Sequence, residues 1–150
     1  MSALRIRYET MQLKKRYETH ELLPDQTLHL LLLTEDAFRD WARRYSRDPW
    51  IPSTGYAMAQ LYAELPGSLA RDRAVGLFVY VKSSFPKTRY AGESRDQLHR
   101  GIPVRSQPAW AQVTPSAAPT SRAAPTSVPS AAPSPSATPY RRVRSMAARR

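Results

Sequence analysis

The last third of the chain contains no acidic residue. Residues 106–150 hold six arginines and no Asp, Glu or Lys, and most of the other positions are Ser, Thr, Ala or Pro. A segment of this composition buries too little apolar surface to offset the entropy lost on folding, so the sequence predicts a disordered, basic, low-complexity tail over 106–150. A folded domain is therefore expected only within residues 1–105, a length that suits one small domain.

The predicted tail has an internal pattern. The triplet Ala-Ala-Pro occurs at 117–119, 123–125 and 131–133, and such units favour the extended polyproline II conformation. The sequence thus predicts a spacer that carries an arginine cluster away from the domain. The cluster consists of Arg141, Arg142, Arg144, Arg149 and Arg150.

The whole chain is strongly basic, with a formal net charge of +11 at pH 7. Residues 1–105 contain 17 Lys and Arg against 12 Asp and Glu, whereas residues 106–150 contain 6 against none. This excess favours anionic partners, which include nucleic acid, acidic protein surfaces and anionic membranes. Arginine outnumbers lysine 19 to 4, and its guanidinium group pairs bidentately with phosphate. A GC-rich coding sequence would explain the same arginine content without selection for binding.

The cysteine count and the apolar runs limit the class of protein. A chain without cysteine forms no disulfide, no thiolate zinc site and no thiol nucleophile. The first residues lack the apolar core of a signal peptide, and the runs 30–33 and 75–81 are too short to span a membrane. We therefore expect an intracellular protein without a transmembrane segment, located in the cytoplasm or nucleus, or associated with a virion if the gene is viral.

The N-terminal third shows the patterns of β-strands. Leu4, Ile6 and Tyr8 alternate with charged residues, and a period of two predicts a strand with one buried face. Farther on, a proline-containing turn separates two runs that are expected to pair. The sequence thus predicts an antiparallel hairpin of 16–23 with 27–33.

Two helices are predicted in the middle of the chain. Thr34 suits a helix N-cap, and acidic residues follow it in the first turn of an amphipathic helix over 35–46. A second helix is expected from Ser53 or Thr54 up to the helix-breaking pair at Pro66. Its apolar residues share one helical face, and they are Met58, Leu61, Tyr62 and Leu65.

A further strand completes the predicted fold. Residues 74–81 are rich in β-branched and aromatic side chains, which is typical of a strand buried on both faces at the centre of a sheet. The predicted fold class is α+β: a small single domain with an antiparallel hairpin, two helices and a central strand, followed by the disordered Pro/Ser/Ala/Arg-rich C-terminal tail.

No arrangement of residues predicts catalysis or a bound cofactor. The three histidines, His20, His29 and His99, lack the spacing of a metal site. Ser84 and Lys87 match the Ser-x-x-Lys pattern of acylating enzymes, but its companion motifs are missing. The five glycines are isolated, so no glycine-rich phosphate-binding loop is present. We therefore expect a protein that is not an enzyme and that holds neither a metal nor another cofactor.

Arginines and aromatic residues are interleaved along the predicted helix 35–46 and just after it. The arginines are Arg39, Arg43, Arg44 and Arg47, and the aromatic residues among them are Trp41, Tyr45 and Trp50. Arginine binds phosphate and aromatic rings stack on unpaired bases, so this pattern and the C-terminal arginines predict binding of RNA or single-stranded DNA. No base-reading motif is visible, which predicts binding independent of sequence. In the alternative arrangement, Trp41 and Tyr45 face the core and the arginines form a solvated helix face.

The sequence leaves two functions open. The first is a non-enzymatic nucleic-acid-binding accessory protein that contacts phosphates through its arginine-rich tail and its basic helix face. The second is a viral or phage structural or accessory protein, of the matrix type or an adaptor for a host factor, that acts through protein contacts. In that case the proline-rich tail recruits the protein partner. Binding of a polyanion that weakens steeply with salt is expected only of the first.

Overall fold

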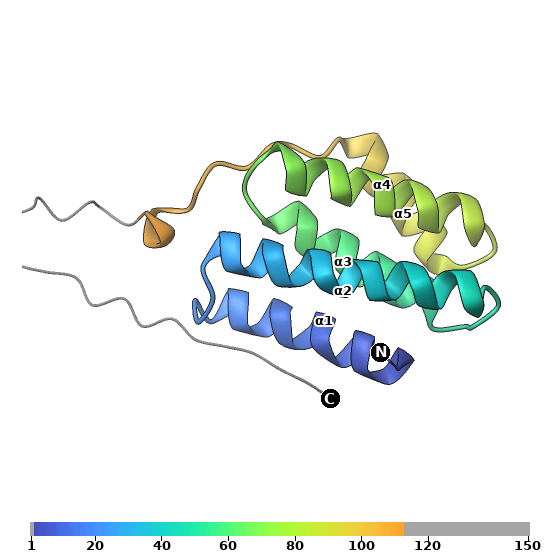
Figure 1. Cartoon of the computed structure of the whole chain (residues 1–150). Helices are drawn as coiled ribbons and strands as arrows, with labels where there is room; N and C mark the ends of the chain where they lie inside the picture. Colours follow the sequence, from blue (N-terminus) through green and yellow to red (C-terminus); the bar gives the residue numbers. More distant parts are fainter. Residues whose placement is uncertain (1, 113–150) are drawn as a thin grey trace, which may run out of the picture. The chain divides into compact units, whose positions relative to one another are not determined.

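The computed structural model describes residues 2–112, and the fold of this part of the chain is helical (Figure 1). The predicted α+β class is wrong, because these residues form no strand and only one isolated bridge, between Pro66 and Arg105. Residues 2–112 form five α-helices and a short 3₁₀ turn (η1). Their bounds are α1 Ala3–Glu18, α2 Pro24–Arg44, α3 Ile51–Glu64, α4 Ser68–Ser84, α5 Arg89–Arg100 and η1 Ala109–Ala111.

The strand predicted at Leu4, Ile6 and Tyr8 is the first turn and a half of α1. Ile6 is buried, but Leu4 and Tyr8 are 74% and 60% exposed, so the alternation does not mark a common face. The buried positions of α1 are Ile6, Thr10 and Leu13, which follow the spacing of a helix. A pattern of three apolar residues was too short to separate period two from period 3.6.

The predicted hairpin of 16–23 with 27–33 is also wrong, and the reason is Pro24. Proline suits the first position of a helix, since its missing N–H would have no intrahelical partner there. Pro24 takes that place in α2, and the Gln26 side-chain oxygen accepts from the N–H of Leu23 at 3.3 Å. The predicted helix 35–46 is the second half of α2. Thr34 is therefore no cap, and its hydroxyl donates to the Leu30 carbonyl at 2.9 Å inside the helix.

The central strand predicted over 74–81 lies inside α4. The β-branched and aromatic content of this run suggested a strand, but tertiary packing overrides such propensities. The residues that α4 buries recur at helical intervals, and Val79 between them is 43% exposed. Those buried residues are Ala70, Ala74, Leu77, Phe78 and Val81.

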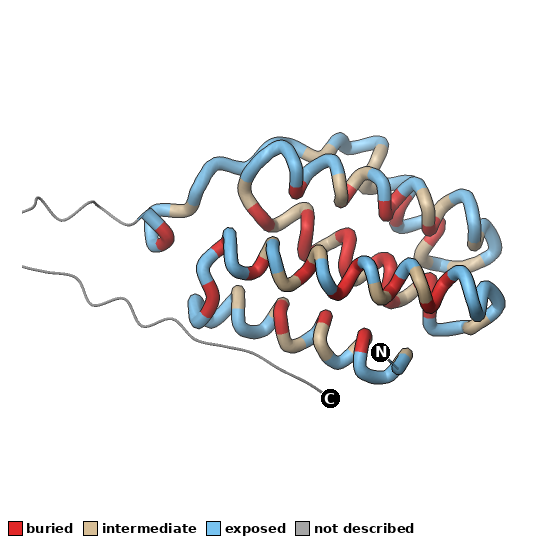
Figure 2. Tube along the Cα trace, viewed as in Figure 1, coloured by how far each residue is buried: buried red, intermediate tan, exposed pale blue. Residues whose placement is uncertain are grey.

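Helix α3 lies at the centre of the folded unit and touches each of the other four helices. It is buried along almost its whole length, as Figure 2 shows. The sequence predicted this helix and its end before Pro66, although it begins at Ile51 rather than after Ser53. Gly55 lets neighbouring helices approach α3, because a Cβ atom there would lie 3.1 Å from both Phe38 and Val81. The core thus consists of helix pairs packed around α3.

The segment after α5 returns along the loop between α3 and α4. The Arg105 side chain donates to the Ala63 carbonyl at 2.8 Å, and the Arg105 carbonyl accepts from the N–H of Gly67 at 2.9 Å. Beyond the expected domain end at residue 105, Trp110 stacks on His20 with 4.3 Å between ring centroids. The predicted tail falls for the most part on residues 113–150, which lie outside the described residues.

Candidate nucleic-acid interface

The turn between α2 and α3 is organised by Asp48. Helix α2 ends with the N–H of Tyr45 donating to the Trp41 carbonyl at 2.9 Å. One carboxylate oxygen of Asp48 then accepts from the Trp41 indole N–H at 3.1 Å, and the other accepts from the backbone N–H of Trp50 at 3.0 Å. Because both oxygens are engaged, Asp48 holds the turn in one conformation.

This turn presents two aromatic side chains to solvent. Tyr45 is 63% exposed and Trp50 is 50% exposed. The guanidinium carbon of Arg7, from α1, lies 3.8 Å from the centroid of the Trp50 ring, a cation–π contact. We call this surface the α2–α3 corner and define it by Arg7, Arg44, Tyr45, Arg47 and Trp50.

Two of the three cations of the corner, Arg44 and Arg47, are exposed, whereas Arg7 is half-buried. Arg44 forms an ion pair with Asp40 at 3.2 Å, but the two side chains are 69% and 50% exposed. An exposed pair of this kind contributes little to stability, so Arg44 can exchange its carboxylate for another anion. Arg47 is exposed and forms no ion pair with any residue of the range 2–112. A pocket of about 400 Å³ lies beside Tyr45, between the start of α1 and the end of α2.

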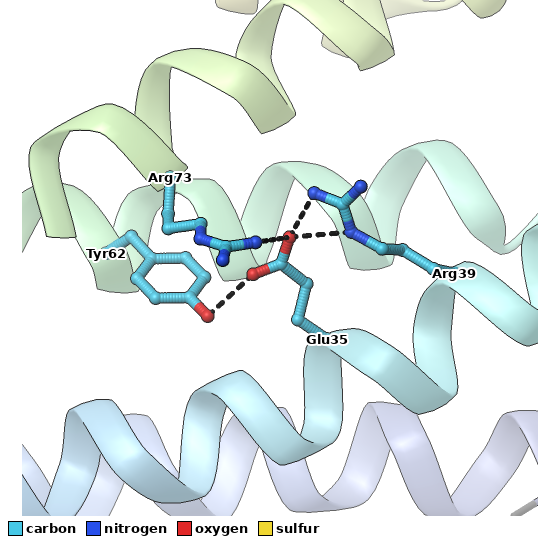
Figure 3. A network of polar contacts seen from close by, with 4 residues as sticks. All are labelled: Glu35, Arg39, Tyr62 and Arg73. Atoms are coloured by element: carbon cyan, nitrogen blue, oxygen red, sulfur yellow. Dashed lines mark hydrogen bonds and ion pairs between the residues drawn. The ribbon is translucent and has the colours of Figure 1, made fainter. Parts of the chain in front are cut away.

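Arg39 has a different place, in a polar network that joins three helices. Its Nε and Nη2 atoms donate to one oxygen of Glu35, at 2.8 and 2.5 Å. Glu35 is 1% exposed, and Arg73 from α4 lies 3.5 Å from the same oxygen. Tyr62 from α3 donates to the other oxygen at 2.8 Å (Figure 3). Two cations and one hydroxyl therefore compensate the buried carboxylate, as a buried charge requires.

The network also affects the acidity of Tyr62. Burial is the main cause that raises the pKa of Tyr62 far above its ordinary value, and its hydrogen bond to the Glu35 carboxylate adds to the effect. Tyr62 thus remains a proton donor at neutral pH. Glu35 was expected in the first turn of a helix, and the structure places it in the middle of α2, where it pairs with Arg39.

The four arginines predicted along and just after the helix 35–46 are thus divided. Arg44 and Arg47 belong to the α2–α3 corner, Arg39 is held by Glu35, and Arg43 lines a groove between α2 and α4. The two aromatic residues of the helix are divided as well, because Trp41 is 5% exposed while Tyr45 projects into solvent. The arginines predicted in the tail, Arg141, Arg142, Arg144, Arg149 and Arg150, lie outside the described residues.

Arg7 is the corner residue that the sequence did not reveal. Read as part of a strand, it belonged to the solvated face and had no relation to residue 50. Its contact with Trp50 exists because α1 is a helix that packs against α3. If residues 3–18 had been predicted as a helix, the helical face that carries Arg7 would have been known. Its contact with Trp50 would still not have been predicted.

Within residues 2–112, no group of three or more His, Asp or Glu side chains is placed to hold a metal ion. His20 stacks on Trp110, whereas His29 and His99 are exposed on helices. None of the described helices combines the length and apolar character needed to cross a bilayer.

Comparisons with models of protein families, with curated proteins and with solved structures found no match for this chain.

Proposed function

We propose that the protein is a non-enzymatic nucleic-acid-binding accessory protein that holds RNA or single-stranded DNA without reading its sequence. The observation that carries this proposal is the exposure of Tyr45 and Trp50 beside Arg7, Arg44 and Arg47 at the α2–α3 corner. Exposed aromatic rings among arginines suit a single strand, because each base offers a face for stacking and each phosphate an anion for a guanidinium group.

The corner and the C-terminal arginines have complementary roles in this proposal. Stacking of a base on an aromatic side chain contributes about 1–3 kcal/mol, and the pocket beside Tyr45 offers space next to the ring. The arginines of 141–150 supply charge without geometric demands. Neutralising about six phosphates of a single strand gives a log–log dependence of affinity on salt with a slope of about −4. The predicted cytoplasmic, nuclear or virion location agrees with such a partner and stays a prediction.

The proposal is tested by fluorescence anisotropy with labelled mixed-sequence RNA and single-stranded DNA between about 50 and 200 mM salt. The full chain is compared with a variant in which the five arginines of 141–150 are glutamine. The wild type should bind both strands with the slope given above, and the variant should lose about three units of slope. Absence of binding by the wild type at the lowest salt would overturn the proposal.

Two substitutions separate the corner from general charge. Tyr45→Ala should weaken binding about tenfold, since a stacked base is lost. The matched control is Tyr8→Ala on α1, because Tyr8 is 60% exposed and lies outside the corner. Arg47→Gln is compared in the same way with Arg100→Gln, an exposed arginine at the end of α5. Equal effects of each pair would show that the corner has no special role.

The alternative, a viral or phage structural or accessory protein that acts through protein contacts, would need a different surface. Among the described residues, the groove between α2 and α4 is the surface that suits it, because its lining is mainly apolar.

A further inference from the structure

A groove of about 800 Å³ runs between α2 and α4, apart from the α2–α3 corner. Its apolar lining comes from both helices and consists of Phe38, Ala42, Leu77, Tyr80 and Phe85. Phe38 and Leu77 are almost fully buried in the core, whereas Tyr80 and Phe85 are half-buried. The groove thus has a floor that belongs to the core and apolar walls that another molecule can cover.

Charge is distributed on one side of the groove only. Arg39 and Arg43, one turn apart on α2, line it, and no acidic residue is among its lining. Arg39 is already neutralised in part by Glu35. Arg43 forms no ion pair with any residue between 2 and 112, and its Nε donates to the Arg39 carbonyl at 3.4 Å. An apolar surface with cations along one edge is complementary to an apolar surface with acids along one edge.

Gly76 lies in the wall that α4 contributes. A glycine inside a helix costs about 1 kcal/mol relative to alanine. Neither the backbone conformation nor a close contact within the described residues requires glycine at position 76. Its φ is not positive, and a Cβ atom built on it would meet nothing within 4 Å. The groove is therefore open above the backbone of α4, and another backbone can approach closely at this point.

The length of the groove fits a short helix. On α4 the lining residues run from Gly76 to Ser84, and Phe85 follows directly after the helix. The helical part corresponds to about 12 Å along the helix axis at about 1.5 Å per residue. A docked helix of two to three turns covers this length with apolar side chains at i, i+4 and i+7, the spacing of helix-in-groove recognition. Helices α2 and α4 run in the same direction on the two sides, as Figure 1 shows.

A nucleic-acid strand fits this groove less well than a helix does. The wall from α4 offers Gly76, Tyr80 and Ser84 to a ligand, but no cation. A phosphodiester backbone in the groove would therefore find cations on one side and an apolar wall on the other, where desolvation of phosphate is costly. An amphipathic helix places its apolar face on the walls and its acids beside Arg43.

We propose that the α2–α4 groove docks an acidic amphipathic helix of a partner protein, with its apolar side chains between Ala42 and Tyr80 and its carboxylates on Arg43. This interaction is independent of the proposed nucleic-acid binding, because it uses other residues. It would make the chain an adaptor that joins a protein partner to a nucleic acid.

The test is a selection of 16-residue peptides from a displayed library on the immobilised full chain, with fluorescence anisotropy of the selected peptides. We expect peptides with apolar residues at i, i+4 and i+7 and with Asp or Glu beside them. On Gly76→Leu, which fills the groove, their affinity should fall at least tenfold. On the matched control Gly92→Leu, an exposed glycine in α5 with nothing within 4 Å of its Cβ position, it should change less than twofold.

Arg43→Glu should also lower the affinity of these peptides at least tenfold, and thermal unfolding shows whether each variant is folded. The proposal is overturned if the selection returns no peptides, if the peptides lack the helical spacing, or if they bind Gly76→Leu as well as the wild type. If the peptides bind Gly76→Leu as well as the wild type, their binding site is a basic segment outside the groove. It is also overturned if Gly76→Leu weakens RNA binding and leaves peptide binding intact. None of these peptide results bears on the proposed nucleic-acid binding, which the salt dependence of RNA binding by the wild type tests separately.

Discussion

The hydroxyl of Tyr62 in α3 donates a 2.8 Å hydrogen bond to a carboxylate oxygen of Glu35 in α2, and both side chains are buried. The other oxygen of Glu35 accepts from Arg39 and lies near Arg73 (Figure 3). A buried carboxylate is tolerated only while its partners remain. The network of Glu35, Arg39, Tyr62 and Arg73 therefore connects α2, α3 and α4, and changes to its members should alter stability measurably.

Replacing Tyr62 by phenylalanine removes the donor and keeps the ring. Because Glu35 then loses a hydrogen bond in a buried position, the free energy of unfolding should fall by about 2 kcal/mol at pH 7. The control is Tyr17→Phe, since the hydroxyl of Tyr17 makes only a long 3.4 Å contact with the Glu64 carbonyl. Urea unfolding followed by circular dichroism measures both. A loss no larger for Tyr62→Phe than for Tyr17→Phe would show that the Tyr62–Glu35 bond contributes little.

The same pair predicts how stability depends on alkaline pH. Burial and the bond to Glu35 raise the pKa of Tyr62 in the folded protein, whereas in the unfolded chain it is about 10. Above pH 10 the unfolded chain releases this proton and the folded protein keeps it. The stabilisation that comes from the raised pKa of Tyr62 is thus complete below pH 10. It is lost as pH rises above 10, by up to about 1.4 kcal/mol of unfolding free energy per pH unit.

Tyr62→Phe lacks this titration. The difference in the free energy of unfolding between the wild type and Tyr62→Phe should therefore shrink between pH 10 and 11. Urea unfolding of both proteins from pH 8 to 11 measures the difference. Other tyrosines with raised pKa values, such as Tyr17 and Tyr80, are common to both proteins and cancel. A difference that stays constant over the whole range would contradict the prediction.

Arg39 and Arg43 look equivalent in the sequence but should behave differently. Arg39→Gln removes a cation from the buried Glu35 and should cost about 1–2 kcal/mol of unfolding free energy, since half of the arginine side chain is solvated. Arg43→Gln should change stability by less than about 0.5 kcal/mol, because it breaks no ion pair. Thermal unfolding of the two variants measures this. Equal losses would show that the network does not depend on Arg39.

The second half of α2 and helix α3 could be predicted from the sequence, whereas α1, the first half of α2 and α4 could not. The face of Met58, Leu61, Tyr62 and Leu65 keeps the helical period over two turns, so α3 was recognisable. At the N-terminus, alternation of Leu4, Ile6 and Tyr8 was an accident, as only Ile6 enters the core. In α4, aromatic and β-branched residues that favour strands are held in a helix by packing on α3.

The candidate site was predictable in part, because local patterns show residue types and not their partners. The interleaved arginines and aromatic residues drew attention to Arg44, Tyr45 and Arg47, which lie together on the surface. The opposite surroundings of Trp41 and Tyr45 follow from the end of α2 at Arg44, which the sequence located only within a few residues. Arg7 comes from another helix, and no local pattern could have joined it to the corner.

Ser94 in α5 is fully buried, and its hydroxyl has no hydrogen-bond partner within residues 2–112. Since an unsatisfied buried hydroxyl costs about 1–3 kcal/mol, Ser94→Ala should raise the free energy of unfolding by about 1 kcal/mol. Ser83→Ala controls for the higher helix propensity of alanine, because Ser83 is exposed and its hydroxyl donates to the Tyr80 carbonyl. Chemical unfolding compares them. A loss of stability in Ser94→Ala would reveal a partner for the hydroxyl, such as a buried water.

Two helical glycines should respond to alanine with opposite signs. At Gly55 a Cβ atom would lie 3.1 Å from Phe38 and from Val81, and both side chains are too deeply buried to move away. We expect Gly55→Ala to cost about 1 kcal/mol even after the gain in helix propensity, because overpacking a core typically costs about 1–3 kcal/mol. At Gly76 nothing lies within 4 Å of that position, so alanine there should stabilise by about 0.5–1 kcal/mol. Thermal unfolding of the two variants measures both changes in stability. A stabilised Gly55→Ala would show that α2 and α4 are not packed tightly on α3.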